Sequence, residues 1–468
     1  MLRLYCENDL ETTGDLREAL EEQIELRRTM MREMEEELQA SGMNHVFSLQ
    51  DLRSKSDAQI AEAVIKQGVF LRTGAIPRKR PASNKGFFYK APDYIQFRTE
   101  QLQSVLHIVQ NSPMLMKESG HVAMPAAIKK LRIELGGVTF KMGLGGLHSQ
   151  EAEVTHRADE ETILRDIDVV SYYPYLMLNS GMYPDATGPT FLDVFRDIVE
   201  TRVAAKRAKN KVKADSLKIT VNGTFGKTSS KWSILYNPQM MIQTTITGQL
   251  SILMLIEWFT LAGIPVVSAN TDGIVLKYPR RKEERQRKLV SIWEQTARLE
   301  TEETNYSSLH SRDVNSYVAI KTDGQIKTKG AFARAGLMKN PANEVCLDAI
   351  EAYLKAGTPP EETIAACTDI RKFLTVRRVS GGAVKDDEFY GKAIRWYYGT
   401  GVRGVVRDRE TGNAVSRTKG AVLMMELADT LPNDLDHEWY VKETYDMLAD
   451  LAVLPRAPKP KLPRRGTK

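Results

Sequence analysis

The sequence predicts an α+β fold with more than one packed unit. The chain has 468 residues, of which 42% are hydrophobic, and this is enough for two or more hydrophobic cores. Strand-like apolar runs lie at 163–171 and 264–276, and helical patterns fill 190–217 and 239–262. Apolar positions three and four residues apart predict an amphipathic helix over 15–40.

The region between the first helix and the first long strand is mixed. It covers residues 46–150 and contains a proline-rich basic bend at 77–92. The glycine-dense sequence LGGLHS at 144–149 predicts a loop.

The C-terminal third of the chain combines both kinds of element. It is predicted to be helical from residue 342, rich in strands over 376–406 and helical again over about 437–454. The basic tail at 455–468 is predicted to be disordered.

Composition excludes several classes of protein. The three cysteines, Cys6, Cys346 and Cys367, are widely spaced, which indicates a reducing compartment and argues against a zinc site. The longest apolar stretch is interrupted by Glu257 and Pro265, so no membrane span is expected. The charged N-terminus is unlike a signal peptide, and we expect a cytoplasmic protein.

Basic residues are clustered in the sequence. Residues 72–90 contain six basic residues, three aromatic residues and no acid. Residues 202–231 contain nine basic residues and the single acid Asp215. Basic stretches with aromatic residues suit a phosphate backbone with exposed bases. A solvated charged face is the alternative explanation for each cluster.

Two acids are candidates for a metal site. Asp272 lies at the tip of the predicted hairpin in IPVVSANTDGIVLKY, where a simple turn would already explain Asn270 and Gly273. Asp168 ends an alternating apolar stretch and precedes SYYP. Two acids on separate strands are the minimum for holding two divalent ions in phosphoryl transfer. Without metal they would repel each other, which would raise one pKa.

These residues carry a resemblance to a known family. DVVSYYP (168–174) resembles motif A, DxxSLYP, of family B DNA polymerases, and ANTDG (269–273) resembles motif C, YxDTDS. KITVNGTFG (218–226) is similar to motif B, and Arg202 and Lys206 reproduce the RxxxK pair that precedes it. The motifs occur in the order of the family. Within these motifs the departures from the family include Tyr172, Gly223, Phe225 and Asn270.

The resemblance extends over nearly the whole chain and favours phage-type members. GLGGLHS (143–149) resembles a loop before motif A, and residues 312–330 resemble the primer-grip region, with Asn315 in place of a lysine. Residues 391–399 and 437–448 resemble the phage-type thumb.

The resemblance implies a right-hand polymerase with an antiparallel-sheet palm, helical fingers and a mixed α/β thumb. The expected domains are a remnant of an exonuclease domain at 1–45, a basic connecting region at 46–150, the palm at 151–188 and 233–341, the fingers at 189–232, the thumb at 342–454 and the basic tail at 455–468.

The first residues resemble the last part of a proofreading domain. Tyr5 and Asp9 match the third exonuclease motif, YxxxD, on a helix. One acid of such a site cannot hold its ions, so we expect no proofreading by this chain alone. The missing part would be encoded as a separate polypeptide, lost or trimmed away. An acidic first turn of an ordinary helix is the alternative.

The resemblance also assigns roles to individual residues. Asp168 and Asp272 are the expected catalytic acids, and they hold two Mg²⁺ ions, or Mn²⁺ as a substitute, with the Val169 carbonyl. Tyr173 is expected to exclude a ribose 2′-hydroxyl. The expected nucleotide-binding residues are Ser171, Tyr172, Tyr173, Arg202, Lys206, Lys218 and Asn222. The expected DNA-binding residues are Gly145, Gly146, His148, Gly223, Thr271, Tyr317, Lys327 and Lys329.

The expected partners are primer–template DNA and deoxynucleoside triphosphates, and no membrane. A separate exonuclease-bearing polypeptide is a further partner if the missing part is encoded separately rather than lost or trimmed away. The 50 positions from Asp168 to Lys218 leave little room for the insertion of protein-primed relatives, which favours a nucleic-acid primer. If the chain is viral, the host cytoplasm is the expected location.

Two alternatives stay open. A reverse transcriptase-like polymerase usually has adjacent acids at the motif C tip, whereas here Asp272 lies between Thr271 and Gly273. A catalytically inactive, polymerase-like DNA-binding subunit would account for Asn270 and the missing exonuclease residues.

Overall fold

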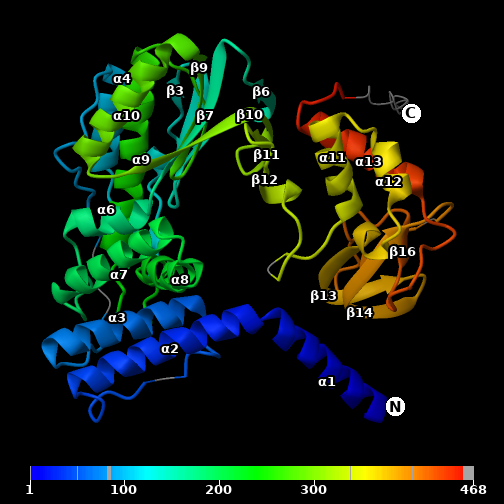
Figure 1. The fold of residues 1–468 in the computed structure, drawn as a ribbon, viewed down its shortest axis with the longest axis horizontal. Helices are drawn as coiled ribbons and strands as arrows, with labels where there is room; N and C mark the ends of the chain where they lie inside the picture. Colours follow the sequence, from blue (N-terminus) through cyan, green and yellow to red (C-terminus); the bar gives the residue numbers. More distant parts are fainter. Residues whose placement is uncertain (1, 50, 82–85, 338, 403, 457–468) are drawn as a thin grey trace, which may run out of the picture. The chain divides into compact units, whose positions relative to one another are not determined.

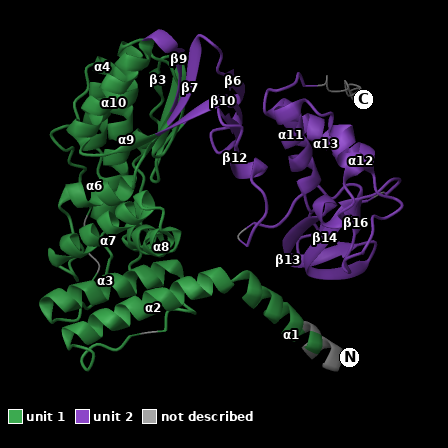
Figure 2. Ribbon diagram, viewed as in Figure 1, with its two compact units in different colours: residues 1–148, 167–274, 282–302 green, residues 149–166, 275–281, 303–468 purple. Residues whose placement is uncertain are grey.

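The computed structural model describes residues 2–49, 51–81, 86–337, 339–402 and 404–456, with residues 2–6 and 8 by their backbone only. The predicted tail at 455–468 lies almost entirely outside this range. The chain forms two compact units with an α+β composition and antiparallel strand pairs (Figures 1 and 2). Unit 1 comprises Met1–His148, Ile167–Ile274 and Lys282–Glu302, and unit 2 comprises Ser149–Asp166, Val275–Arg281 and Glu303–Lys468.

Unit 1 is mainly helical. Its helices are α1 (Leu2–Ala19), α2 (Glu21–Ser41), α3 (Asp57–Thr73), α4 (Glu100–Gln110), α5 (Ala126–Lys129), α6 (Tyr172–Ser180), α7 (Thr190–Arg207), α8 (Lys211–Lys227), α9 (Pro238–Leu261) and α10 (Glu283–Ala297). Its strands are β1 (Leu115–Met116), β2 (Val122–Ala123), β3 (Ile133–Leu135), β4 (Val138–Met142), β5 (Leu147–Ser149), which ends one residue into unit 2, and β8 (Val266–Asn270).

Unit 2 combines strands with a small group of helices. Its strands are β6 (Ala152–Arg157), β11 (Ser316–Lys321), β12 (Ile326–Thr328), β13 (Thr375–Lys385), β14 (Glu388–Tyr398), β15 (Arg407–Asp408) and β16 (Ala421–Leu423). Its helices are α11 (Glu344–Ala356), α12 (Pro360–Ala366) and α13 (His437–Asp450), with the short 3₁₀ turns η2 (Gly330–Phe332) and η3 (Ile370–Phe373). The turn η1 (Arg280–Lys282) begins in unit 2 and ends in unit 1.

Besides β5, three strands contain residues of both units: β7 (Thr162–Val169), β9 (Gly273–Pro279) and β10 (Thr301–Asp313). Hydrogen bonds give the strand order β12-β11-β10-β7-β9-β8-β5-β4-β3, with β6 paired to β10. A separate sheet of unit 2 has the order β15-β13-β14-β16.

Local sequence signals explain several helix boundaries. Ser56 and Gln59 form a capping box at the start of α3, and the Asn237 side chain caps α9, whose first residue is a proline. The predicted helix over 190–217 is two helices, because Lys209 has φ +56° and Asn210 caps the start of α8. The prediction of a loop over 144–149 is wrong in its second half, where residues 147–149 form β5.

The core of unit 1 lies under the helices that carry the candidate site. Buried side chains of α3, α6, α7, α8 and α9 form one cluster, which includes Ile65, Met177, Phe195, Val221 and Met240. Helix α9 is buried along most of its length, as its continuous apolar sequence predicts. This packing fixes α6, α7 and α8 relative to one another.

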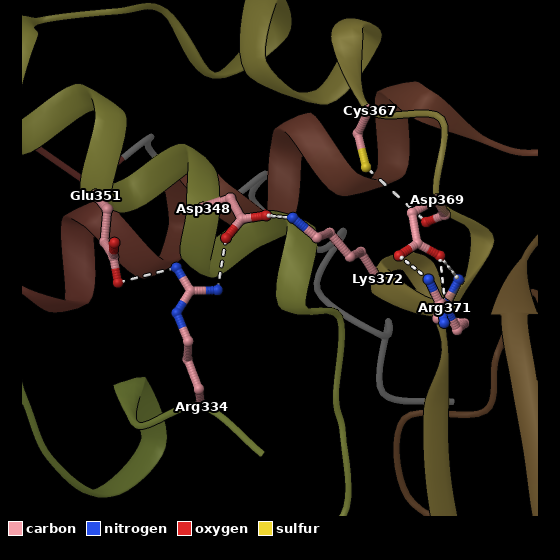
Figure 3. A network of polar contacts seen from close by, with 7 residues as sticks. All are labelled: Arg334, Asp348, Glu351, Cys367, Asp369, Arg371 and Lys372. Atoms are coloured by element: carbon pink, nitrogen blue, oxygen red, sulfur yellow. Dashed lines mark hydrogen bonds and ion pairs between the residues drawn. The ribbon is translucent and has the colours of Figure 1, made fainter. Parts of the chain in front are cut away.

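A polar network stabilises the helical part of unit 2 (Figure 3). Asp348 on α11 accepts hydrogen bonds from Arg334 Nη1 at 2.5 Å and Lys372 Nζ at 2.8 Å. Arg334 also pairs with Glu351 at 3.0 Å. Asp348 therefore joins two segments that lie before and after α11 in the sequence.

No helix in the described part of the chain combines the length and apolar character that crossing a bilayer requires.

Candidate active site

Asp168 is positioned by the end of β7. The strand is buried over residues 163–167 and at Val169, whereas Asp168 itself is half-buried. The chain then turns sharply at Ser171, which has φ +47° and ψ +46°, and α6 begins at Tyr172. A serine in this left-handed conformation is strained, and such residues cluster at functional sites.

Asp272 is positioned by the hairpin of β8 and β9, which confirms the predicted hairpin. The turn is tight: the Asp272 amide donates to the Asn270 carbonyl at 2.7 Å, and Thr271 has φ +60°. The Thr271 amide donates to the Leu147 carbonyl of β5 at 2.8 Å. The tip is therefore held on both sides, although a β-branched residue with positive φ is strained.

The structure brings Asp168 and Asp272 together within unit 1. The Val169 amide donates a hydrogen bond to the Asp272 carbonyl at 2.8 Å. Asp168, which precedes Val169 at the end of β7, therefore lies beside the hairpin tip that carries Asp272. A Cβ atom on the buried Gly273 would collide with Asp168 Oδ1. Gly273 has no side chain, and this leaves room for the Asp168 carboxylate. The structure thus gives a more specific reason for glycine at this position than the turn that the sequence predicts.

A hollow of about 280 Å³ opens beside these acids, entirely within unit 1. Residues of β7, α6, α7, α8 and the hairpin tip line it: Val169, Ser171, Tyr172, Tyr173, Pro174, Arg202, Val221, Asn222, Phe225, Thr271 and Asp272. Most of the residues assigned to metal and nucleotide binding are thus adjacent. Val221 and Pro174 were not assigned a role from the sequence, although both lie within the quoted motifs, 218–226 and 168–174.

Arg202 on α7 presents a cation to this hollow. Its Nη1 donates to Ser171 Oγ at 2.7 Å. Its Nε is buried and has no hydrogen-bond partner among the described residues. Because buried donors are normally paired, this arrangement favours an additional acceptor such as a phosphate oxygen.

The other two predicted phosphate-binding lysines do not line the hollow. Lys206 forms an ion pair with Glu302, and both side chains are about half exposed. Next to it, Arg207 pairs with Glu300 at 2.5 Å. Lys218 lies exposed on α8. Of Arg202 and Lys206, only Arg202 lines the hollow beside the acids in this conformation.

Tyr173 forms one wall of the hollow. Its ring stacks on Phe225 of α8 at 4.8 Å between centroids and 30° between planes, and its hydroxyl donates to the Gly145 carbonyl. Burial, together with the charge of Asp272, raises the pKa of Tyr173, so the phenol stays protonated and remains a donor.

Tyr172 stacks on Tyr173, with 5.7 Å between ring centroids, and is anchored on α9. It is fully buried, and its hydroxyl donates to the Gly248 carbonyl of α9 at 2.5 Å. Burial raises the pKa of this phenol well above its usual range. The side chain therefore fixes α6 on α9, and its ring edge contributes to the hollow.

The glycine-rich loop at 143–146 lies against the hairpin tip. A Cβ atom on Gly146 would lie 2.6 Å from Thr271 Oγ1, and His148 pairs with Asn270 in the β5–β8 register. Gln249 of α9 binds the Gly143 backbone twice, at 2.9 and 2.8 Å. The sequence did not single out Gln249, because its contact spans more than one hundred residues.

Gly223 has a packing role in this structure. A Cβ atom there would lie 2.7 Å from Ala61 Cβ and 2.8 Å from the Asp57 carbonyl, both on α3. The absence of a side chain at Gly223 thus allows α3 to pack closely on α8. The predicted contact of Gly223 with DNA stays a prediction.

Three predicted DNA-binding residues, Tyr317, Lys327 and Lys329, belong to unit 2. Lys327 Nζ lies 3.0 Å from Asp166 Oδ2 and 3.1 Å from Tyr306 Oη. Burial alone would lower the pKa of Lys327, but Asp166 raises it above its usual value. Lys329 is exposed, and its amide donates to the Tyr317 carbonyl at 3.0 Å. The Lys327 charge is therefore already matched by a buried carboxylate.

The proposed exonuclease residues lie on α1. Asp9 is exposed there, and the Tyr5 side chain lies outside the described part of the structure. Their assignment stays a prediction.

The donor atoms near the hollow fit magnesium. Within the described ranges no group of three or more His, Cys, Asp or Glu side chains could hold a metal ion alone. Mg²⁺ characteristically uses one or two carboxylates together with substrate phosphates, so Asp168, Asp272 and the Val169 carbonyl form a suitable oxygen set. Zinc sites in proteins are built mainly from cysteine and histidine side chains, and this set contains neither.

Comparisons with known proteins give a limited result. No protein-family model matches the chain, and no curated protein matches it. Among solved structures, the family B DNA polymerase from the hyperthermophilic archaeon Pyrobaculum calidifontis is similar, with a TM-score of 0.48 and 14% sequence identity. The likeness covers 98% of this chain and 56% of the archaeal chain, so this chain spans little more than half of that protein. At this level the likeness is too weak to assign a family or an activity.

Proposed function

We propose that the chain is a DNA-directed DNA polymerase of the family B type, which adds deoxynucleotides to a primer 3′-hydroxyl and releases pyrophosphate. The observation that supports this most is the meeting of Asp168 and Asp272 beside a hollow that also contains Arg202 and Tyr173. The order of the three sequence motifs around these residues agrees with the same reaction.

The two acids and Arg202 account for the charges of the reaction. Asp168, Asp272 and the Val169 carbonyl would hold two Mg²⁺ ions, or Mn²⁺, which supply activation of the 3′-hydroxyl and charge neutralisation when bound. The Arg202 guanidinium would bind phosphate oxygens of the incoming nucleotide, and Ser171 would keep it oriented through the 2.7 Å hydrogen bond. Ser171 and Tyr172 would add backbone N–H groups.

Lys206 and Lys218 would reach the triphosphate only after a rearrangement. Lys206 must leave Glu302, but an ion pair between half-exposed side chains is weak and readily exchanged for a phosphate. We assign both lysines to nucleotide binding in a closed state of α7 and α8.

Tyr173 would select the sugar. Its ring is fixed by the stacking on Phe225 and by the hydrogen bond to Gly145, so it cannot easily move away from a 2′-hydroxyl. Asn222, on the exposed side of α8, would contact the nascent base pair.

The same proposal assigns parts of the chain to the palm, fingers and thumb of a right-hand polymerase. The palm would be 151–188 and 233–341, the fingers 189–232 and the thumb 342–454. Gly145, Gly146, His148 and Thr271 would contact the template, and Tyr317, Lys327 and Lys329 the primer. We also propose that the chain is of phage type and lacks a complete proofreading site of its own; a separate exonuclease-bearing polypeptide is a partner only if the missing part is encoded separately. Detectable 3′–5′ digestion of a labelled strand by the pure chain would contradict the proofreading part.

A DNA-binding subunit without activity is the second candidate, because Asn270 replaces the first acid of the family motif at the hairpin tip. Asn270 pairs with His148 in the sheet, and its side-chain oxygen accepts a hydrogen bond from Thr271 Oγ1 at 3.2 Å.

Extension of a 5′-labelled primer on a template, with Mg²⁺ and deoxynucleoside triphosphates, separates the two candidates. We expect extension by the wild-type chain that stops on addition of a chelator. Extension should also be lost in Asp168→Asn and in Asp272→Asn, which keep the side-chain volume. Binding of primer–template without any extension would favour the inactive subunit.

A further inference from the structure

Trp232 remains exposed although its surroundings are fixed. The residue is 74% exposed, whereas the next two residues, Ser233 and Ile234, are 2% and 8% exposed. Glu62 of α3 accepts hydrogen bonds from Ser233 Oγ at 2.9 Å and from the Ile234 amide at 3.1 Å. The exposure of the indole is thus not a result of a loose segment. A single exposed apolar residue is common on protein surfaces, so the significance of this ring depends on the charged groups around it.

The surroundings of this ring are basic. Lys79 Nζ lies 4.7 Å and Lys231 Nζ 5.4 Å from the ring centroid. These lysines come from the two basic clusters of the sequence, 72–90 and 202–231, which the active site does not fully explain.

A cavity of about 370 Å³ adjoins the ring, also within unit 1. Its lining includes Trp232 together with Lys55, Lys66 and Lys227. The single carboxylate of the lining, Glu62, pairs with Lys227 at 3.1 Å and binds the backbone after Trp232. The local charge around the ring is therefore strongly positive.

We propose that Trp232, with Lys79 and Lys231 beside it, forms a binding surface for single-stranded DNA. An unpaired base stacks on the indole, and the lysines bind the phosphates on either side of it. Aromatic rings within a basic groove are the usual means of holding a strand without sequence preference. A base stacked on tryptophan is held more strongly than an ammonium over an exposed ring, so the lysines move from the ring to the phosphates.

This surface is close to the candidate active site along the chain. Helix α8, which carries Asn222 and Phe225, ends at Lys227, five residues before Trp232. Binding of a strand to Trp232 needs neither Asp168 nor Asp272, so it can be tested without the reaction. The choice of DNA rather than RNA rests on the proposed function.

The test is a fluorescence titration of the full chain with oligodeoxythymidylate, in the Asp168→Asn/Asp272→Asn background and without metal. Of the five tryptophans, Trp258, Trp293 and Trp396 are at most 9% exposed and Trp439 is half-buried, so quenching should report on Trp232. We expect quenching that is lost in Trp232→Phe while the affinity, measured by anisotropy of a labelled strand, falls only slightly.

Trp232→Ala should weaken binding about tenfold, the effect of losing one stacked base. Leu261→Ala is the matched control, because Leu261 is 52% exposed at the end of α9 and is not part of the surface. Equal affinity of Trp232→Ala and the Leu261→Ala control would overturn the proposal, and so would quenching that persists in Trp232→Phe.

The lysines are tested by salt dependence. Lys231→Gln should reduce the slope of log affinity against log salt by about 0.7, the value for one lost phosphate contact on a single strand. Lys130→Gln, the same change at an exposed position of unit 1, should leave the slope unchanged. A tighter complex with an RNA strand of the same length, or with an acidic peptide, would overturn the assignment to DNA.

Discussion

At the scale of single residues, the account depends on how closely Gly273 approaches the Asp168 carboxylate. Gly273 lies between the hairpin tip and the end of β7, and Asp168 Oδ1 occupies the position that a Cβ atom would need. Asp272 is exposed and Asp168 is half-buried, so the pair is accessible to ions and substrate from one side.

We therefore expect Gly273→Ala to displace the Asp168 carboxylate. A displacement of about 1 Å from the reactive geometry reduces turnover on the order of a hundredfold. Single-turnover nucleotide incorporation measures this effect, with the midpoint of thermal unfolding as a control for folding. Full activity of Gly273→Ala would show that Asp168 is not held where the structure places it.

Tyr173→Ala should increase ribonucleotide incorporation, because it removes the ring that stacks on Phe225 and lies beside Asp272. We expect the preference for deoxynucleotides to fall by about tenfold or more. Competition between the two nucleotides in primer extension measures it. Tyr173→Phe keeps the ring but not the bond to Gly145, and it should retain the preference. Unchanged discrimination in Tyr173→Ala would contradict the assigned role.

At the scale of elements, the strands and helices that carry the site follow from local sequence patterns. The alternation before Asp168 and the two apolar runs around Asp272 predict β7 and the β8–β9 hairpin, and both occur. The spacing of apolar residues and the presence of turn-forming residues are local signals, so they can be recognised without knowledge of the fold.

Contacts between distant elements were not predictable in the same way. The sequence gives no indication that α3 packs on α8 at Gly223, that Gln249 holds the glycine-rich loop, or that Glu302 pairs with Lys206. Each of these contacts depends on tertiary packing, which the local spacing of apolar residues does not determine.

The packing of α8 on α3 gives a stability prediction with an internal control. Gly223→Ala would place a Cβ atom against Ala61 and the α3 backbone, and this overpacking should cost about 1–3 kcal/mol of unfolding free energy. Gly226→Ala, on the same helix, meets nothing within 4 Å and should be neutral or stabilising by up to about 1 kcal/mol. Urea unfolding measures both variants, and equal stabilities would contradict the packing described here.

At the scale of the whole molecule, the stability should respond to pH through a buried histidine of unit 2. His310 is fully buried between Thr155 Oγ1 at 2.8 Å and Ser308 Oγ at 3.0 Å. Burial, with the charges of Arg157 and His156, lowers the pKa of His310 to about 4. The unfolded chain has the ordinary value of about 6.5.

Between these two values the unfolded chain binds a proton that the folded chain does not. Stability should therefore fall as the pH drops from about 6.5 to about 4, by at most about 1.4 kcal/mol per pH unit for this group. Urea unfolding at pH 7.0 and 5.5 measures the slope, which should be smaller in His310→Gln. The matched control His121→Gln, at an exposed histidine, should keep the wild-type slope. An unchanged slope in His310→Gln would contradict the burial of a neutral imidazole.

The central claim is that Asp168 and Asp272 act as one metal-binding pair in nucleotidyl transfer. The most direct test is single-turnover incorporation by Asp168→Asn, Asp272→Asn and the double variant, at saturating primer–template. If the pair acts as a unit, each single variant should lose nearly as much activity as the double variant. Independent, multiplicative losses, or activity retained in either single variant, would contradict the claim.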